Sequence, residues 1–446
     1  MNISIKILTV LFLGVSCISS YANDLTVSPG TLGKAISTVD SGEEELVIKG
    51  NIGASDFEVF SELPSGIKTL DLSGLSLDGG FVATGDAERQ SYFKPGELPA
   101  YLFFGSKFDK VILPENLVEV GEGAFADSDV SEVIFPGNCS LIASYAFYNC
   151  KNLKNIQLPE KGVKIEEGVF GKCVSLENIN IPAGSVLAGK FIFQDTAITD
   201  LDLSGVASFG DFSISSSGEL KNLTVNENVV NTKGVAMSNW ALRSINGLGT
   251  EVPDMMAAVC PVLSTDNILE NVSEIGDYAF ADSEMEMIIL GGKINYIGEY
   301  SFAHNNNIIG IDANALEANI PDVAETAFAG CDESKIALYV TYGSYDAWMS
   351  HPYWSRFDIH RGADASVGAL EKEKDVIAIR ATENGVRLES NYGIGNYSVT
   401  ATDGVNILKG YSSEEVLDID LSQSSVKVVI VKVWNHKGEK TVTLMR

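Results

Sequence analysis

Histidines and basic side chains are scarce in this chain of 446 residues. It has four histidines, and its 31 lysines and arginines are outnumbered by 60 acidic residues, which gives a formal net charge of −29. Such a surface repels phosphates, so no nucleic-acid partner is expected. The histidines are scattered, and the sequence contains no HExxH, GxSxG or phosphate-binding glycine motif. We therefore predict no enzyme, no metal and no cofactor.

Long apolar runs are missing as well. No stretch reaches the ~20 apolar residues of a transmembrane helix, so no transmembrane segment is expected. Residues 1–22 nevertheless have the pattern of a signal peptide, with an apolar run over 7–15 and a small-x-small site at Ser20-Tyr21-Ala22. A lipid anchor at Cys17 is the less favoured alternative, because Gly14 stands where a lipobox normally has leucine. We expect an exported protein, secreted or on the outer cell surface, with the periplasm as the alternative.

Phenylalanine recurs at a nearly constant distance along the chain. The first four members are 22, 23 and 23 residues apart, and the third residue after each phenylalanine is small or polar. A fixed period in this range means that one supersecondary unit is stacked on itself, which is a solenoid. The phenylalanines are Phe125, Phe147, Phe170, Phe193, Phe280, Phe302 and Phe328, and their partners are Ser128, Cys150, Cys173, Thr196, Ser283, Asn305 and Cys331.

Cysteine is also rare, and its placement argues against disulfides. Five cysteines remain if residues 1–22 are removed, and an odd number excludes a complete disulfide framework. Three of them, Cys150, Cys173 and Cys331, occupy the repeat position in which serine and threonine also occur. We interpret them as small buried packing residues.

Each repeat also contains a short strand with alternating apolar residues, often closed by proline, as in Ile156 to Pro159. Strand ends from Ile48 to Leu338 predict about 13 rungs of 21–24 residues. An insertion falls at 75–100. The pattern weakens over 205–270, where Ile214 and Met237 stand in for phenylalanine.

The best-preserved units read Ile275-Gly276-Asp277-Tyr278-Ala279-Phe280 and Ile297-Gly298-Glu299-Tyr300-Ser301-Phe302. This pattern resembles the BspA-type leucine-rich repeat of bacterial surface and secreted proteins. The resemblance implies a right-handed curved stack, and residues 338–360, rich in tyrosine and tryptophan, resemble the closing segment of that family. It further implies adhesin-like binding to a host matrix or cell-surface protein.

The domain organisation follows from where the period stops. We predict a leucine-rich-repeat solenoid over 23–362, with an N-terminal cap and the aromatic C-terminal cap at 338–360. A polar linker follows at 363–374. Short alternating runs separated by turn signals over 375–446 predict a small antiparallel β-sandwich.

The outward side chains of four successive strands are the candidate binding site. Stacked at ~4.8 Å, amides and carboxylates would form a polar ladder able to hydrogen-bond a glycan or a polypeptide. Any solvent-facing side of a sheet is polar, so the same pattern also fits a face with no ligand. The candidates are Asn155, Gln157, Asn178, Asn180, Asp200, Asp202, Asn222 and Thr224.

Other rungs have apolar residues in the same outward positions, namely Ile112, Ile134, Met287 and Ile289. They would anchor a protein partner or be covered by loops or a second copy of the chain.

The sequence leaves two hypotheses about function. The first is a non-catalytic interaction protein that binds a host protein or glycan through its strand face. The second is a structural or self-associating envelope component without a specific host ligand.

Overall fold

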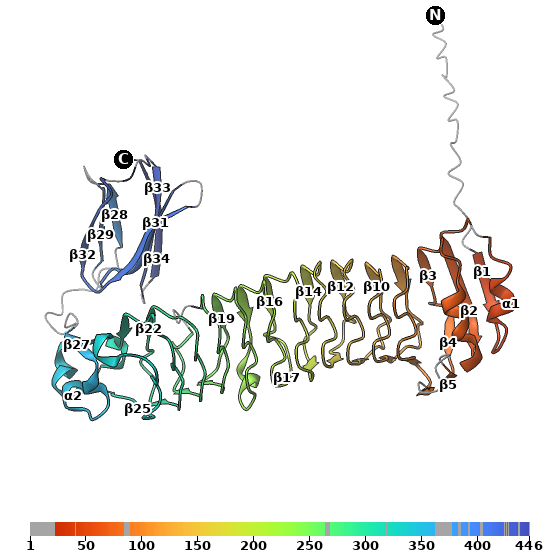
Figure 1. Cartoon of the computed structure of the whole chain (residues 1–446), viewed down its shortest axis with the longest axis horizontal. Helices are drawn as coiled ribbons and strands as arrows, with labels where there is room; N and C mark the ends of the chain where they lie inside the picture. The colour runs from red at the N-terminus through yellow and green to blue at the C-terminus, as the bar shows by residue number, and fades with distance from the viewer. Residues whose placement is uncertain are drawn as a thin grey trace, which may run out of the picture.

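The protein is an elongated β-solenoid of about 14 turns followed by a small β-rich domain (Figure 1). Its structure is a computed structural model that describes residues 23–445 apart from 41, 84–89, 264–267, 318, 362–376, 382–384, 391–392, 402–404, 423, 425, 427 and 436–437. The predicted signal peptide, Cys17 and the predicted linker lie outside the described residues. The predicted solenoid fold is confirmed.

Nearly every turn contributes one three- to eight-residue strand to a first series of parallel strands. Side chains alternate between the two faces of a strand. In a three-residue strand the central side chain therefore points into the core, and its two neighbours point outwards. The described residues 268–273 form no strand, so the series pauses between β19 and β22. Its members are β2 (Glu45–Ile52), β3 (Thr69–Asp71), β8 (Lys110–Ile112), β10 (Glu132–Ile134), β12 (Asn155–Gln157), β14 (Asn178–Asn180), β16 (Asp200–Asp202), β18 (Asn222–Thr224), β19 (Ser244–Asn246), β22 (Met287–Ile289), β24 (Gly310–Asp312), β26 (Ala337–Val340) and β27 (Asp358–Arg361).

A second series of two-residue strands follows in most turns, and it also pairs in parallel. Its second residue is buried in most turns, so both series face one shared core. The members are β7 (Glu97–Leu98), β9 (Glu119–Val120), β11 (Leu141–Ile142), β13 (Lys164–Ile165), β15 (Val186–Leu187), β17 (Ser208–Phe209), β20 (Glu251–Val252), β21 (Glu274–Ile275), β23 (Tyr296–Ile297) and β25 (Asp322–Val323).

The periodic phenylalanines form a buried column of stacked rings. The Phe125 and Phe147 ring centroids are 5.1 Å apart with an interplanar angle of 5°, and the stack begins one turn earlier, at Phe103. In the weakened middle, Ile214 continues the column as predicted. The assignment of Met237 was wrong by one residue, because the backbone ladder places Ala236 in that position. A small residue there leaves no aromatic signal to read from the sequence.

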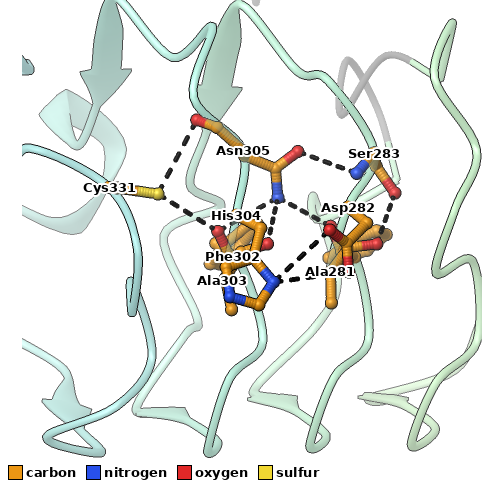
Figure 2. A network of polar contacts seen from close by, with 9 residues as sticks. Ala281, Asp282, Ser283, Phe302, Ala303, His304, Asn305 and Cys331 are labelled. Atoms are coloured by element: carbon orange, nitrogen blue, oxygen red, sulfur yellow. Dashed lines mark hydrogen bonds and ion pairs between the residues drawn. The ribbon is translucent and has the colours of Figure 1, made fainter.

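The small residues three positions later form a second buried column, which is polar (Figure 2). Cys173 Sγ donates to the Phe147 carbonyl at 3.0 Å, and Asn305 Nδ2 donates to the Phe280 carbonyl at 2.8 Å and to the Phe302 carbonyl at 3.0 Å. Asn305 Oδ1 accepts from the Ser283 N–H at 3.0 Å. The position therefore selects a small side chain that can donate to a buried backbone carbonyl.

The two ends of the solenoid differ from the repeats. At the first end, β1 (Asn23–Val27) pairs with β2 beside α1 (Leu32–Ile36), and the predicted insertion contains β4 (Leu75–Leu77) and a hairpin of β5 (Gly80–Ala83) and β6 (Gln90–Phe93). At the other end, the fully buried Trp354 packs against Phe328, the last phenylalanine of the column. Short helices are α2 (Tyr345–Ser350) and the 3-10 turns η1 (Ala54–Asp56), η2 (Glu58–Glu62), η3 (Glu227–Val229), η4 (Asn314–Leu316), η5 (Glu333–Lys335), η6 (Tyr342–Ser344) and η7 (Trp354–Arg356).

The C-terminal strands form two antiparallel sheets around their own apolar core, as a small β-sandwich does. The sandwich lies beside the last turns of the solenoid (Figure 1). Tyr411 donates to Asp312 Oδ2 at 3.0 Å, and Lys409 lies 3.2 Å from Glu286 Oε1. Its strands are β28 (Ala378–Ala381), β29 (Gly385–Glu389) and β32 (Val416–Asp420) in one sheet, and β31 (Asn406–Ser412), β30 (Gly395–Ala401), β33 (Val428–Asn435) and β34 (Gly438–Met445) in the other.

Candidate binding face

The eight candidate side chains lie on β12, β14, β16 and β18, on the upper side of the solenoid in Figure 1. We call the outward surface of β10 to β19 the strand face. Strand register places Asn155 beside Asn178 and Gln157 beside Asn180. It likewise places Asp200 beside Asn222 and Asp202 beside Thr224. The candidates therefore form two rows along the solenoid, and all are exposed except Thr224, which is half-buried.

The first row is organised by hydrogen bonds between turns. Asn178 Nδ2 donates to Asn155 Oδ1 at 3.2 Å, and Asn222 Nδ2 donates to Asp200 Oδ1 at 2.6 Å. Ser244 Oγ extends the row by donating to Asn222 Oδ1 at 2.9 Å. These bonds hold the side chains in fixed orientations and so reduce the entropy that binding would cost.

The side chains of the second row make fewer hydrogen bonds to one another. Within the part of the chain that the structure describes, the side chains of Gln157 and Asn180 make no hydrogen bond. Each primary amide has two donor hydrogens and an acceptor oxygen available to a ligand.

Two carboxylates give the face a fixed negative charge. Hydrogen bonds from the Thr199 hydroxyl and the Asn222 amide hold the pKa of Asp200 below its ordinary value. Hydrogen bonds from Ser204, first from its backbone N–H, lower the pKa of Asp202 in the same way. Each bond favours the ionised form, so both groups are charged at neutral pH.

A groove of about 780 Å³ brings five of the eight candidates together. They are Asn155, Gln157, Asn178, Asn180 and Asp200, whereas Asp202, Asn222 and Thr224 continue the rows beyond it.

Sequence reasoning missed two residues of the groove, Glu132 and Glu160. The lining also includes Ile134, one of the outward apolar residues named from the sequence, which is 39% exposed. Glu132 and Ile134 are the outward residues of β10, so the same alternation that found the other candidates also predicts their orientation. Glu160 lies after Pro159, outside any strand, and no periodic signal marks it.

Beyond the strand face, the outward surface of the first strand series changes in the last turns. Met287 and Ile289 on β22 are half-buried, and the neighbouring Glu286 contacts Lys409 of the sandwich. The Tyr411 ring also packs on Tyr339 of β26, with centroids 5.8 Å apart. The outward residues of the last turns therefore contact a domain of the same chain, while the groove lies several turns away.

A second depression, of about 520 Å³, lies on the short second strands. Its lining includes four acidic residues, Glu251, Asp254, Glu274 and Asp277, and one basic residue, Lys233. Sequence analysis did not find it, because two-residue strands are too short for an alternating pattern to show. Nowhere in the described ranges do three or more histidine, cysteine or acidic residues gather as a metal site would require.

Comparison with known proteins identifies the repeat. A family model described as a BspA type leucine rich repeat region, in six copies, matches residues 96–187, 141–252 and 250–344. Together these ranges span more than half of the chain. The chain belongs to the BspA-type leucine-rich repeat family. No curated protein matches the sequence significantly.

Several solved structures are similar to this BspA-type chain. A leucine-rich repeat protein from Bacteroides ovatus is 18% identical, with 76% of this chain and 92% of that chain covered and a TM-score of 0.46. The T. pallidum leucine-rich repeat protein is 22% identical, with coverages of 42% and 88% and a TM-score of 0.33. A leucine-rich cell surface protein from Faecalibacterium prausnitzii is 17% identical, with coverages of 55% and 87% and a TM-score of 0.25. At these scores the structures support no statement about function.

Among the described residues, no helix is both long and apolar enough to cross a lipid bilayer.

Proposed function

We propose that this BspA-type protein is an exported, non-catalytic interaction protein that binds a macromolecule through the strand face. The observation that carries the proposal is the groove, in which amides and a carboxylate from three successive turns converge. A repeating polymer, either a polypeptide or a glycan, offers donors and acceptors at several points along its length. An extended ladder can engage several of them at once.

The chemistry of the groove favours recognition over catalysis. A general acid needs a pKa raised towards neutrality. Hydrogen bonds instead lower the pKa of Asp200, which lines the groove. The fixed first row and the unpaired amides of the second row instead resemble a preorganised hydrogen-bonding surface. The expected partner is a host matrix protein, a cell-surface protein or a glycan.

A binding screen tests the proposal. The purified chain from residue 23 onwards is screened against extracellular matrix proteins and glycans. Each partner found is titrated against a variant in which Asn178, Asn180, Asp200 and Asp202 are all replaced by alanine. We expect the affinity to fall at least tenfold, because several hydrogen bonds, two of them to charged groups, are lost together.

The control variant carries four matched substitutions on the second-strand surface, where Thr250, Glu251, Glu274 and Asn295 become alanine. These residues are all exposed and also comprise two carboxylates and two neutral polar side chains. The net charge therefore changes equally in both variants. The strand-face proposal is wrong if both variants bind like the wild type or if both weaken alike.

Self-association is the second candidate function, and the exposed Ile134 in the groove is the observation that favours it. An apolar side chain beside the polar rows of the groove would be removed from water in a contact between two copies of the chain. Light scattering over a range of concentrations separates the two functions. A mass that rises with concentration, and that returns to the monomer in Ile134→Asp, would favour the self-associating envelope component.

A further inference from the structure

The outward surface of the last solenoid turns carries an apolar patch. Strand register places Met287 of β22 beside Gly310 of β24, and Gly310 beside Ala337 of β26. A Cβ added to Gly310 would lie 2.9 Å from Sδ of Met287 and 3.3 Å from Cε2 of Tyr339. These two side chains therefore approach each other over a residue that has no side chain of its own. We call Met287, Gly310 and Tyr339 the terminal patch.

The sandwich reaches the terminal patch with one aromatic side chain. The rings of Tyr411 and Tyr339 pack with centroids 5.8 Å apart. The Tyr411 hydroxyl donates to Asp312 Oδ2 at 3.0 Å, and Lys409 of the same strand lies 3.2 Å from Glu286 Oε1. Both carboxylates border the patch, one in register with Tyr339 and the other directly before β22. A buried ring whose hydroxyl is hydrogen-bonded is a typical anchor of a contact between proteins.

Tyr339 is in contact with both domains. His360 of β27 stacks on its ring with centroids 5.5 Å apart and an interplanar angle of 29°. Burial raises the pKa of Tyr339, and the carboxylates of Asp358, Asp312 and Glu414 raise it further. Glu414 belongs to the sandwich, so a second part of that domain lies near the terminal patch.

The contact between the two domains is small. Figure 1 shows the sandwich extending away from the solenoid, with one end at the last turns. The side chains of Lys409 and Glu286 are 61% and 55% exposed, so water and salt screen their attraction. The contact therefore depends more on the ring of Tyr411 than on the ion pair, and a contact of this kind can open and close.

We propose that the sandwich is a releasable cover for the terminal patch, anchored by Tyr411. While the sandwich is docked, the patch is filled by a side chain of its own chain. After release, the patch becomes a docking surface for a polypeptide that offers a tyrosine to the ring of Tyr339 and to the carboxylate of Asp312. The terminal patch is separate from the strand face, and the proposal does not depend on the function proposed for that face.

Pulsed EPR distance measurements test the release. Nitroxide labels are attached to cysteines that replace the exposed Asn307 of the solenoid and Asn406 of the sandwich. The half-buried Cys331 is changed to serine, and the other four described cysteines are buried. We expect Tyr411→Ala to widen the distance distribution. Tyr296→Ala is the control, because it removes a tyrosine of the second-strand surface that is 41% exposed, and it should leave the distribution unchanged.

Exchanging the ion pair tests the same contact without changing Tyr411. Glu286→Lys and Lys409→Glu each bring like charges together, so each should widen the distance distribution. The double variant restores opposite charges and should narrow the distribution again. Both side chains are exposed, so these variants should fold. A role confined to one domain would not give this rescue.

A peptide with the sequence of residues 406–412 contains both anchor residues and is the probe for docking. It is titrated into the wild type and into Tyr411→Ala, and binding is followed by NMR. If the sandwich is docked for about nine-tenths of the time, the wild type should bind the peptide about tenfold more weakly than the variant. The same peptide with alanine in place of tyrosine should not bind. If Tyr411→Ala does not fold, Lys409→Glu takes its place.

Three results would overturn the proposal. The first is a wild-type distance distribution as wide as that of Tyr411→Ala. The second is a double charge variant that remains as wide as the single variants. The third is a released variant that binds the peptide no better than the wild type does.

Discussion

Replacing Asn305 with alanine removes the most connected side chain of the buried polar column. Its amide joins two turns, because Nδ2 donates to the carbonyls of Phe280 and Phe302. Its Oδ1 accepts from the N–H of Ser283 at 3.0 Å (Figure 2) and from the N–H of Met285 at 3.2 Å. Asn305 is fully buried, so water cannot replace the lost bonds.

The expected loss follows from the number of groups left unpaired. At about 1–3 kcal/mol for each unsatisfied buried group, and with partial relaxation of the turn, Asn305→Ala should lower the free energy of unfolding by about 3–6 kcal/mol. Asn305→Ser should cost roughly half as much, because Ser283 shows that a hydroxyl in this column reaches one carbonyl of the preceding turn. Urea denaturation followed by circular dichroism and by fluorescence of the buried Trp348 and Trp354 measures the change.

His304→Asn is the control for this experiment. His304 is adjacent in sequence but exposed, and its contact with Asp282 at 3.3 Å is a surface pair. Asparagine tolerates the positive φ of 59° at this position, so the stability should change by less than about 0.5 kcal/mol. A loss below about 1 kcal/mol in Asn305→Ala, or an equal loss in the control, would refute the assignment of this column as a source of stability.

Three further predictions concern single positions. Gly168→Ala should lower the urea midpoint, because a side chain at a φ of +59° costs about 1–2 kcal/mol and its Cβ meets the neighbouring tyrosine ring; an unchanged midpoint would contradict this steric account. Burial raises the pKa of the Cys139 thiol to about 12, so this thiol should resist labelling in the native protein and react in urea-unfolded protein. Its contribution to the free energy of unfolding should be lost as the pH rises from the ordinary thiol pKa of 9.0 towards 12. Asn222→Ala should raise the pKa of Asp200 towards its ordinary 3.8 in a carboxyl NMR titration, because one of the two hydrogen bonds that lower it is removed. In the wild type, the stability that Asp200 contributes is present above pH 3.8 and is lost as the pH falls through the lower pKa of the folded state.

Most of the fold could be predicted from the repeat period of the sequence. The prediction of the register failed where another type of residue replaces phenylalanine in the repeat. Phenylalanine at Phe147 or Phe302 is large enough to mark each turn, so the register there was predicted correctly. Ala236 fills the same position without any aromatic signal, and the register slipped by one. Phe103, which begins the column, was missed because it directly follows the insertion.

Only the part of the candidate site that lies on strands was predicted, because there the side chains alternate between inward and outward positions. The outward residues of three-residue strands, such as Asn178 and Asn180, follow from alternation. Their grouping into one groove depends on how the turns after the strands curve, and Glu160 shows that these turns add lining residues.

The residues that hold the stack repeat from turn to turn, whereas we propose that the residues that bind a partner lie between them on the strand face. A single exposed thiol tests this directly, because four of the five described cysteines are buried and the half-buried Cys331 can be replaced by serine, which the column accepts at Ser283. An environment-sensitive fluorophore attached at Gln157→Cys should change its emission when a partner from the binding screen is added, whereas the same label at Glu274→Cys should not. Binding that changes the emission at position 274 but not at 157 would contradict the claim.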